Sequence, residues 1–281
     1  MTVSTGPRPV LAHPALAHPA FPTRSGEASP TLVAVAHGSR DPRALDTVRA
    51  LLRLVRGLRP DVPVRLGHIE LNEPLLSRTL AALPPGRAVL VPLLLGRGHH
   101  VSYDIPAAAA AAPHLDIRLA EPLGPHPLLA EVLHERLLEA GQRIPGPRIP
   151  GPGTHAVVLA AAGSRDPDAA VDTRTTAALL AARLGVPVAP AFASAPSPGV
   201  PEALRMLAAR GRNAAVAAYF TAPGRFAAQC AAAAEAASGW ASAPLGAHPA
   251  MARLVLHRYD QAMATGTTAA TRRLHHGLAS A

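Results

Sequence analysis

The sequence predicts an α/β protein of two similar lobes, each with a mostly parallel sheet and helices on both of its faces. Short apolar segments alternate with helical patterns, an order typical of parallel sheets. The pentapeptide GSRDP occurs at 38–42 and again at 163–167. A chain of 281 residues is also long enough to bury two hydrophobic cores. We therefore expect the active site in the cleft between the lobes.

The first lobe begins with an apolar segment at 31–36, which predicts a buried strand. The residues HGSR follow at 37–40, and the apolar residues from 44 to 55 are then spaced as in a helix. Because ligands bind beyond the carboxyl ends of parallel strands, residues that follow strands are the candidates for a site. Further strands are predicted at 63–69, 87–95 and 115–120.

The second lobe repeats this order. An apolar segment at 155–161 precedes the second GSRDP, and a helical pattern then runs to Leu184. The sequence LGPHP at 123–127 also returns as LGAHP at 245–249. These echoes predict an internal duplication.

Proline and glycine gather before the first copy and between the two copies. The expected organisation is a disordered proline-rich tail at 1–30, a first lobe at 31–143, a linker at 144–154, a degenerate second copy at 155–262 and a tail at 263–281.

The charge of the chain favours an anionic ligand. All 27 basic residues are arginine, against 18 acidic residues, which gives a net charge of +9. Arginine suits carboxylates, whereas a basic stripe interleaved with aromatic residues, as expected for nucleic-acid binding, is missing from the sequence. The single cysteine, Cys230, together with the lack of a secretory or membrane-spanning pattern, predicts a cytoplasmic protein without nucleic-acid or membrane partners.

Three potential metal ligands fall at predicted strand ends in the first copy, namely His37, Glu70 and His100. Imidazole and carboxylate suit divalent metals such as Fe²⁺, Co²⁺, Ni²⁺ or Zn²⁺, and an incomplete set leaves coordination positions open. Each residue alone has a structural explanation, as a loop, capping or solvated side chain. His99 is adjacent to His100, and from the residues alone either imidazole could point inward.

The second copy serves as an internal comparison for these candidates. His37 corresponds to Ala162, His100 to a position near Phe226, and Glu70 to Ala193 or Ser194. All three candidates are lost together while GSRDP remains. A joint loss favours a shared metal-binding role in the first copy.

The motifs 37–40 (HGSR), 70–74 (ELNEP), 91–95 (VPLLL) and 100–106 (HVSYDIP), in this order and spacing, resemble the sirohydrochlorin and cobalt chelatases, the class II tetrapyrrole chelatases. The resemblance is strong over 31–140 and weak over 155–262. It implies two chelatase-like lobes with the metal bound by His37, Glu70 and His100. His100 is chosen over His99 because the family's histidine lies four residues before Asp-Ile-Pro. One departure is His68, which stands where the family has phenylalanine and could be a further ligand or a buried partner.

The resemblance further implies insertion of Fe²⁺, or of Co²⁺ or Ni²⁺, into sirohydrochlorin for siroheme or cobalamin synthesis, with no organic cofactor. His37 and His100 would be catalytic. The acidic macrocycle would meet cationic and backbone donors, and the candidate substrate-binding residues are Gly38, Ser39, Arg40 and Arg97. Arg40 has an alternative, structural role in pairing with Asp41 or Asp166, because it recurs as Arg165.

Two other functions compete with chelation. A tetrapyrrole or metal carrier would bind through the same ligands without turnover. A phosphatase with His37 as nucleophile is disfavoured, because the residue before it is Ala36 and not arginine. We expect a monomer or a weak homodimer.

Overall fold

The computed structural model describes residues 29–142, 155–194 and 197–278. The expected tail up to residue 28 and the expected linker at 144–154 lie outside the described residues. Within them, both predicted lobes are present as separate parallel sheets, which confirms the predicted fold class.

The first lobe has four parallel strands in the order β2-β1-β3-β4. Strand β1 lies inside the sheet, in keeping with its five apolar residues at 32–36, all of which are buried. The elements of the first lobe are β1 (Thr31–Ala36), α1 (Pro42–Leu58), β2 (Val64–His68), α2 (Leu76–Ala81), β3 (Gly86–Pro92), the π-helical turn η1 (His100–Asp104), α3 (Ile105–Ala110) and β4 (Leu115–Leu119).

The second lobe has the same topology, with the order β6-β5-β7-β8 and parallel pairing throughout. Leu32 pairs with Val89 in the first sheet, and Val157 pairs with Ala215 in the second. Its elements are β5 (His155–Ala161), α5 (Pro167–Leu184), β6 (Val188–Phe192), α6 (Val200–Ala208), β7 (Asn213–Ala218), α7 (Arg225–Ala236) and β8 (Trp240–Ala241).

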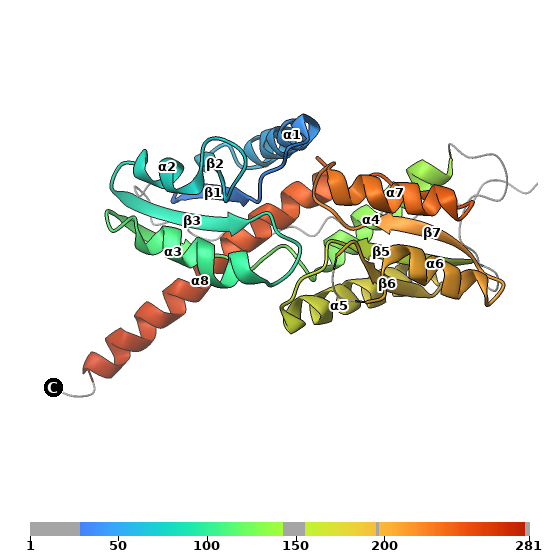
Figure 1. Ribbon diagram of the computed structural model, residues 1–281. Coiled ribbons are helices and arrows are strands. Elements are labelled where there is room, and N and C mark those ends of the chain that lie inside the picture. The colour runs from blue at the N-terminus through green and yellow to red at the C-terminus, as the bar shows by residue number, and fades with distance from the viewer. Residues whose placement is uncertain (1–28, 143–154, 195–196, 279–281) are drawn as a thin grey trace, which may run out of the picture.

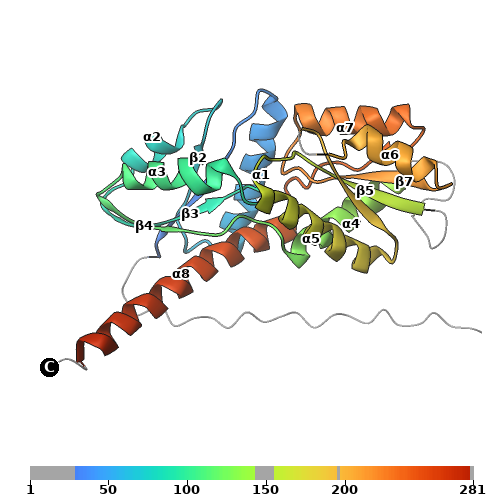
Figure 2. The same cartoon turned by 60° about the horizontal axis from the view of Figure 1, so that its bottom comes forward.

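The last helix of each copy packs on the opposite lobe. Helix α4 (Pro127–Gly141) contacts α5, β7 and β8, whereas α8 (Pro249–Leu278) contacts α1, β3 and β4. Figure 1 shows α4 beside β5 and β7, and both views show α8 crossing from the second lobe to the first (Figures 1 and 2). Each packed lobe therefore includes the last helix of the other sequence copy.

Two arginines fix this exchange with matching contacts. Arg136 on α4 donates to the carbonyl oxygen of Leu245, and Arg258 on α8 donates to that of Leu123. Leu123 and Leu245 begin the repeated LGPHP and LGAHP segments. The two contacts therefore join equivalent positions of the two copies, as expected for an internal duplication.

Helix α8 runs through most of the expected tail at 263–281, because it continues to Leu278. The sequence beyond Met263 contains several alanines and no proline, which is compatible with a continuing helix. Arg118 of β4 donates to the carbonyl oxygen of Met263 and so ties this part of α8 to the first lobe.

The largest hydrophobic cluster spans both lobes. It includes Leu32 of β1, Leu159 of β5 and Met251 of α8, all fully buried. Two smaller clusters lie one in each lobe, around Leu90 of β3 and around Val216 of β7. Within the described parts of the chain, no helix combines the length and the hydropathy needed to cross a membrane.

Candidate metal centre

The loop after β1 holds His37 at the carboxyl edge of the first sheet. Gly38 has a φ of +104°, and a Cβ there would lie 1.8 Å from the carbonyl oxygen of Glu70, so only glycine fits. The backbone N–H of Ser39 donates to Asn72 Oδ1 at 2.7 Å. These contacts join the loops after β1 and β2 and fix the position of His37.

Asp41 starts helix α1 just beyond this loop. Its carboxylate accepts from the backbone N–H and the guanidinium of Arg43. The hydrogen bonds to Arg43 lower the pKa of Asp41. Asp41 is therefore a helix cap and not a partner of Arg40.

His100 opens the π-helical turn η1, and Asp104 at its end orients the imidazole. Asp104 Oδ2 accepts from His100 Nδ1 at 2.5 Å. An ionised carboxylate is only an acceptor, so Nδ1 donates this hydrogen bond, and in the neutral imidazole Nε2 is then the nitrogen open to a metal. Imidazole ligands of metals are commonly held in this way, with the second nitrogen bonded to a carboxylate.

The imidazoles of His37 and His100 face each other. Their Nε2 atoms are 3.2 Å apart, and the rings meet edge to face with centroids 4.7 Å apart. His37 Nδ1 lies 3.2 Å from the carbonyl oxygen of Gly38, so in the tautomer protonated at Nδ1 its Nε2 is the nitrogen open to a metal. Two imidazole–zinc bonds of about 2.05 Å at the tetrahedral angle place their nitrogens about 3.3 Å apart. The spacing therefore suits one divalent metal between the two rings.

Glu70 lies on the other side of the His37 ring. Its Oε1 is 3.6 Å from His37 Nδ1, while His100 faces Nε2. One ion between the two Nε2 atoms would not meet this carboxylate in the arrangement present. Accordingly, no cluster of three or more histidine, cysteine, aspartate or glutamate side chains that could hold a metal occurs among the described residues.

Two other histidines near the site have separate roles. His99 is 72% exposed at its side chain and stacks on Tyr103, with ring centroids 4.9 Å apart. His68 is buried, and its Nδ1 donates to the carbonyl oxygen of Pro74 at 3.2 Å. Burial lowers the pKa of His68. Of the two roles left open for His68, the structure shows the buried partner.

Arg97, a predicted substrate-binding residue, is held by acidic side chains of the second lobe. Its guanidinium binds Asp172 Oδ1 at 2.7 Å and Asp168 Oδ2 at 2.8 Å, and its backbone N–H also donates to Asp172. Both acidic residues lie on α5 of the second lobe. Arg97 therefore bridges the lobes and has little donor capacity left for a substrate.

Arg40 behaves differently from Arg97. Its side chain is exposed, and the described residues include no ion pair to it. Its expected structural pairing with Asp41 is wrong, because Arg43 takes that carboxylate at 2.6 Å. The second-copy counterpart, Arg165, is likewise exposed and without an ion pair in the described structure, while Asp166 caps α5.

The second lobe lacks the imidazoles but keeps the backbone of the site. The N–H of Glu70 donates to the carbonyl oxygen of His37, and the N–H of Ser194 donates to that of Ala162, which assigns Ser194 as the counterpart of Glu70. Phe226 and Ala162 pack on the same hydrophobic cluster. The positions of the imidazoles are thus taken by apolar side chains in the second copy.

The loops of the two lobes meet in reciprocal pairs. A Cβ on Gly98 would lie 3.4 Å from Ser164 Oγ, and one on Gly224 would lie 3.7 Å from Ser39 Oγ. Each GSRDP loop therefore touches the loop that follows the third strand of the other lobe. The histidine pair lies on the first lobe's side of this junction.

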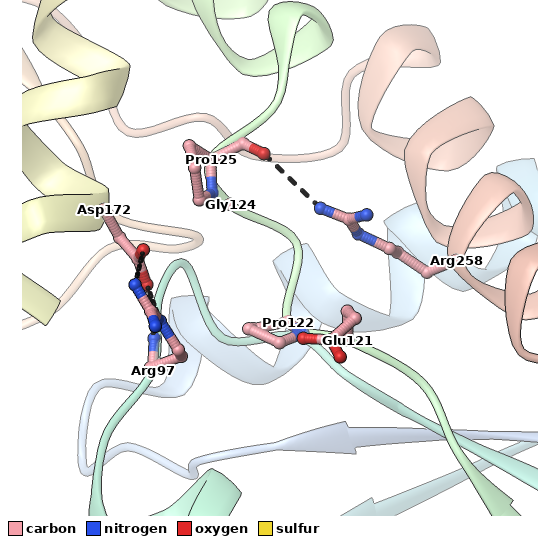
Figure 3. A pocket seen from close by; sticks show the side chains of 7 residues that line it. All are labelled: Arg97, Glu121, Pro122, Gly124, Pro125, Asp172 and Arg258. Carbon is pink, nitrogen blue, oxygen red and sulfur yellow. Dashed lines mark hydrogen bonds and ion pairs between the residues drawn. The ribbon is translucent and has the colours of Figure 1, made fainter. Parts of the chain in front are cut away.

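A pocket of about 270 Å³ also opens at the junction (Figure 3). Arg97 and Asp172 close one side of it, and Arg258 reaches in from α8 towards Pro125, with Glu121 below (Figure 3). Burial lowers the pKa of Arg258, whose Nε has no hydrogen-bond partner among the described residues. Neither His37 nor His100 lines this pocket, so it is separate from the histidine pair.

Sequence reasoning missed three residues that shape the site: Asp104, Asn72 and Asp172. Asp104 had a detectable signal, because residues four apart on a helix share a face with His100. Asn72 and Asp172 act across 33 and 75 residues of sequence, and no local pattern connects them to Ser39 and Arg97.

The fold and this site define a two-lobed α/β protein with two facing imidazoles at the lobe junction. A sequence model of the CbiX family matches residues 31–140 and 156–262, which is most of the chain. The chain belongs to the CbiX family.

Curated relatives match parts of the chain. A sirohydrochlorin cobaltochelatase of Priestia megaterium is 31% identical over 145 residues, which cover 49% of this chain and 46% of that protein. A sirohydrochlorin cobaltochelatase of Methanococcoides burtonii is 27% identical over 123 residues, which cover 38% of this chain and 94% of that protein.

Solved structures share the fold over both lobes. SirB from Bacillus subtilis with Fe³⁺ has a TM-score of 0.71 and 24% identity, over 85% of this chain and 98% of that one. A CbiX structure, described as the terminal enzyme for siroheme biosynthesis in denitrifying bacteria, has a TM-score of 0.61 and 22% identity, over 83% of this chain and 99% of that one.

Proposed function

We propose that the protein is a sirohydrochlorin chelatase, which inserts a divalent metal into an acidic tetrapyrrole. The observation that carries the proposal is the pair of Nε2 atoms of His37 and His100, 3.2 Å apart with both remote nitrogens hydrogen-bonded. Membership of the CbiX family and the names of the relatives support the same activity.

Metal insertion exchanges two pyrrole protons for one dication. The metal must lose solvent, the ring must deform so that its nitrogens face the ion, and both protons must be removed. A neutral imidazole, with an unperturbed pKa near 6.5, either holds a metal or accepts a proton. In the proposed mechanism His37 and His100 hold the ion at an open site and accept protons as it leaves for the ring.

Glu70 has a supporting role in this mechanism. Its carboxylate beside His37 Nδ1 offsets the charge of an approaching dication and orients the imidazole. It binds the metal directly only if the His37 ring turns. The proposed substrate-binding residues of the first lobe are Gly38, Ser39 and Arg40, at the loop between the metal site and α1.

The metal proposed first is Fe²⁺, for siroheme, with Co²⁺ and Ni²⁺ as further substrates. All three accept imidazole and carboxylate ligands. The relatives' names specify cobalt, whereas one structural neighbour is described with Fe³⁺. Complementation of a strain unable to make siroheme tests the iron assignment, and complementation of a strain unable to insert cobalt tests cobalt as the substrate.

The protein is proposed to act in the cytoplasm as a monomer or weak homodimer, without an organic cofactor.

The activity is tested by mixing the purified protein anaerobically with sirohydrochlorin and Fe²⁺ or Co²⁺. The absorbance change of the macrocycle should be faster than the rate with metal alone and should turn over many times per protein. A stoichiometric change that stops after one equivalent identifies a tetrapyrrole or metal carrier. No change beyond the metal-only rate contradicts the proposal.

A further inference from the structure

The second lobe carries a different pair of side chains in the loop after its third strand. In the loop after the third strand, His99 and His100 of the first lobe correspond to Arg225 and Phe226 of the second, because Gly98 and Gly224 occupy matching places against Ser164 and Ser39. The guanidinium carbon of Arg225 lies 4.9 Å from the centroid of the Phe226 ring. A guanidinium presents a fork of donors to a carboxylate, and neither guanidinium nor a phenyl ring supplies a ligand to a metal.

The start of α7, which carries Arg225, lies beside the loop that carries His37. Arg225 is the first residue of α7, directly after Gly224, whose added Cβ would be 3.7 Å from Ser39 Oγ. Ser39 is two residues from His37. Figure 1 shows the start of α7 close to the loop that leads into α1.

The charges around the junction leave some cations without acidic partners. Arg43 is paired with Asp41, and Arg97 with Asp168 and Asp172. In contrast, the described structure contains no ion pair to Arg40, Arg165 or Arg225, all of which are exposed. Arg165 lies beside Ser164, which packs near Gly98 on the loop that carries His100.

We infer that Arg225, held over the Phe226 ring, and Arg165 bind carboxylates of the tetrapyrrole, so that the second lobe supplies the anion-binding half of the site. This inference rests on the proposed function. In it, the first lobe binds the metal and the second binds the rim of the acidic macrocycle. Arg225 and Arg165 determine affinity for the ring, and Phe226 is a positioning residue.

The test compares Arg225→Gln and Arg165→Gln with Arg210→Gln. Arg210 is an exposed arginine between α6 and β7, at the opposite edge of the second sheet, and serves as the matched control. Metal-free sirohydrochlorin is titrated by quenching of its fluorescence, and Co²⁺ binding is measured separately. Loss of a charge-assisted contact should raise the Kd and KM for the tetrapyrrole about 10-fold for each variant. The kcat and the affinity for Co²⁺ should stay at the wild-type values.

Phe226 and salt supply two further readouts. Phe226→Leu should raise the tetrapyrrole KM without changing kcat, and Phe226→Tyr should restore it, because tyrosine keeps the aromatic face. Added NaCl should raise the wild-type KM more than that of Arg225→Gln, since screening removes the same attraction.

The inference is overturned if Arg225→Gln and Arg165→Gln have the same Kd for sirohydrochlorin as Arg210→Gln. It is also overturned if the two variants lose Co²⁺ binding together with sirohydrochlorin binding. A wild-type protein that binds the tetrapyrrole but inserts no metal would contradict the proposed function alone, and the titration would still decide the inference. A wild-type protein that does not bind the tetrapyrrole contradicts both.

Discussion

Asp104 holds His100 in place, with its Oδ2 accepting from His100 Nδ1 at 2.5 Å, and the other nitrogen of that ring thereby faces His37. The two residues are one helical turn apart in η1, so their geometry is set by the backbone of one element. Half of the imidazole pair therefore depends on a carboxylate that does not itself touch the metal position.

Asp104→Ala should lower the rate of metal insertion about 10- to 100-fold, the usual scale for losing a carboxylate behind a metal-bound imidazole. Folding should persist, because the Asp104 side chain is 42% exposed. Asp104→Asn keeps a hydrogen-bond acceptor, so its rate of metal insertion should lie between the rates of the wild type and Asp104→Ala. Asp116→Ala, an exposed carboxylate on β4, is the control, and a wild-type rate in Asp104→Ala would show that His100 needs no orienting partner.

Arg97→Gln should lower the melting temperature while the tetrapyrrole KM stays within about twofold of wild type. The reason is that Arg97 is engaged with Asp168 and Asp172 across the lobe junction. Asp172→Asn should act in the same direction, and the double variant should be less than additive, as expected for residues in contact. An increase in KM with an unchanged melting temperature would restore Arg97 as a substrate-binding residue.

The duplication was predictable because each lobe opens with an apolar strand that is followed by GSRDP, and these two strands, β1 and β5, begin and end as expected. The exchange of α4 and α8 was not predictable. An amphipathic pattern shows that a helix buries one face, but not which sheet it covers. In the same way, the choice of His100 over His99 came from a family resemblance, because two adjacent imidazoles give no local signal of direction.

Gly38→Ala should destabilise the protein by at least about 1 kcal/mol, because a side chain at positive φ is strained and its Cβ would overlap Glu70. Metal insertion should fall as His37 moves with the loop. Gly57→Ala is the matched control: it lies in α1 with no atom within 4 Å of the new Cβ, and alanine should stabilise the helix by about 0.5–1 kcal/mol. Chemical denaturation measures both, and equal stabilities for the two variants would contradict the geometry of the loop.

The stability of the protein should fall as pH decreases from about 6.5 towards 4. Burial lowers the pKa of His126 to about 4, and its Nδ1 accepts the N–H of Leu128 at the start of α4. The unfolded chain binds a proton at a higher pH than the folded chain, so acid favours unfolding. His126→Asn keeps a capping acceptor without titrating, and its unfolding free energy should vary less with pH than that of the wild type. If the unfolding free energies of the two proteins varied with pH in the same way, His126 would not cause the loss of stability in acid.

The rate of sirohydrochlorin metallation in His37→Ala, His100→Ala and His99→Ala, compared at matched thermal stability, tests the central claim most directly. The imidazole pair predicts a loss of about 100-fold or more for His37→Ala and for His100→Ala, the scale expected when a positioned acid–base group is removed. His99→Ala should remain near the wild-type rate, because its exposed ring stacks on Tyr103 away from His37. Loss of turnover in His99→Ala with an unchanged rate in His100→Ala would contradict the account.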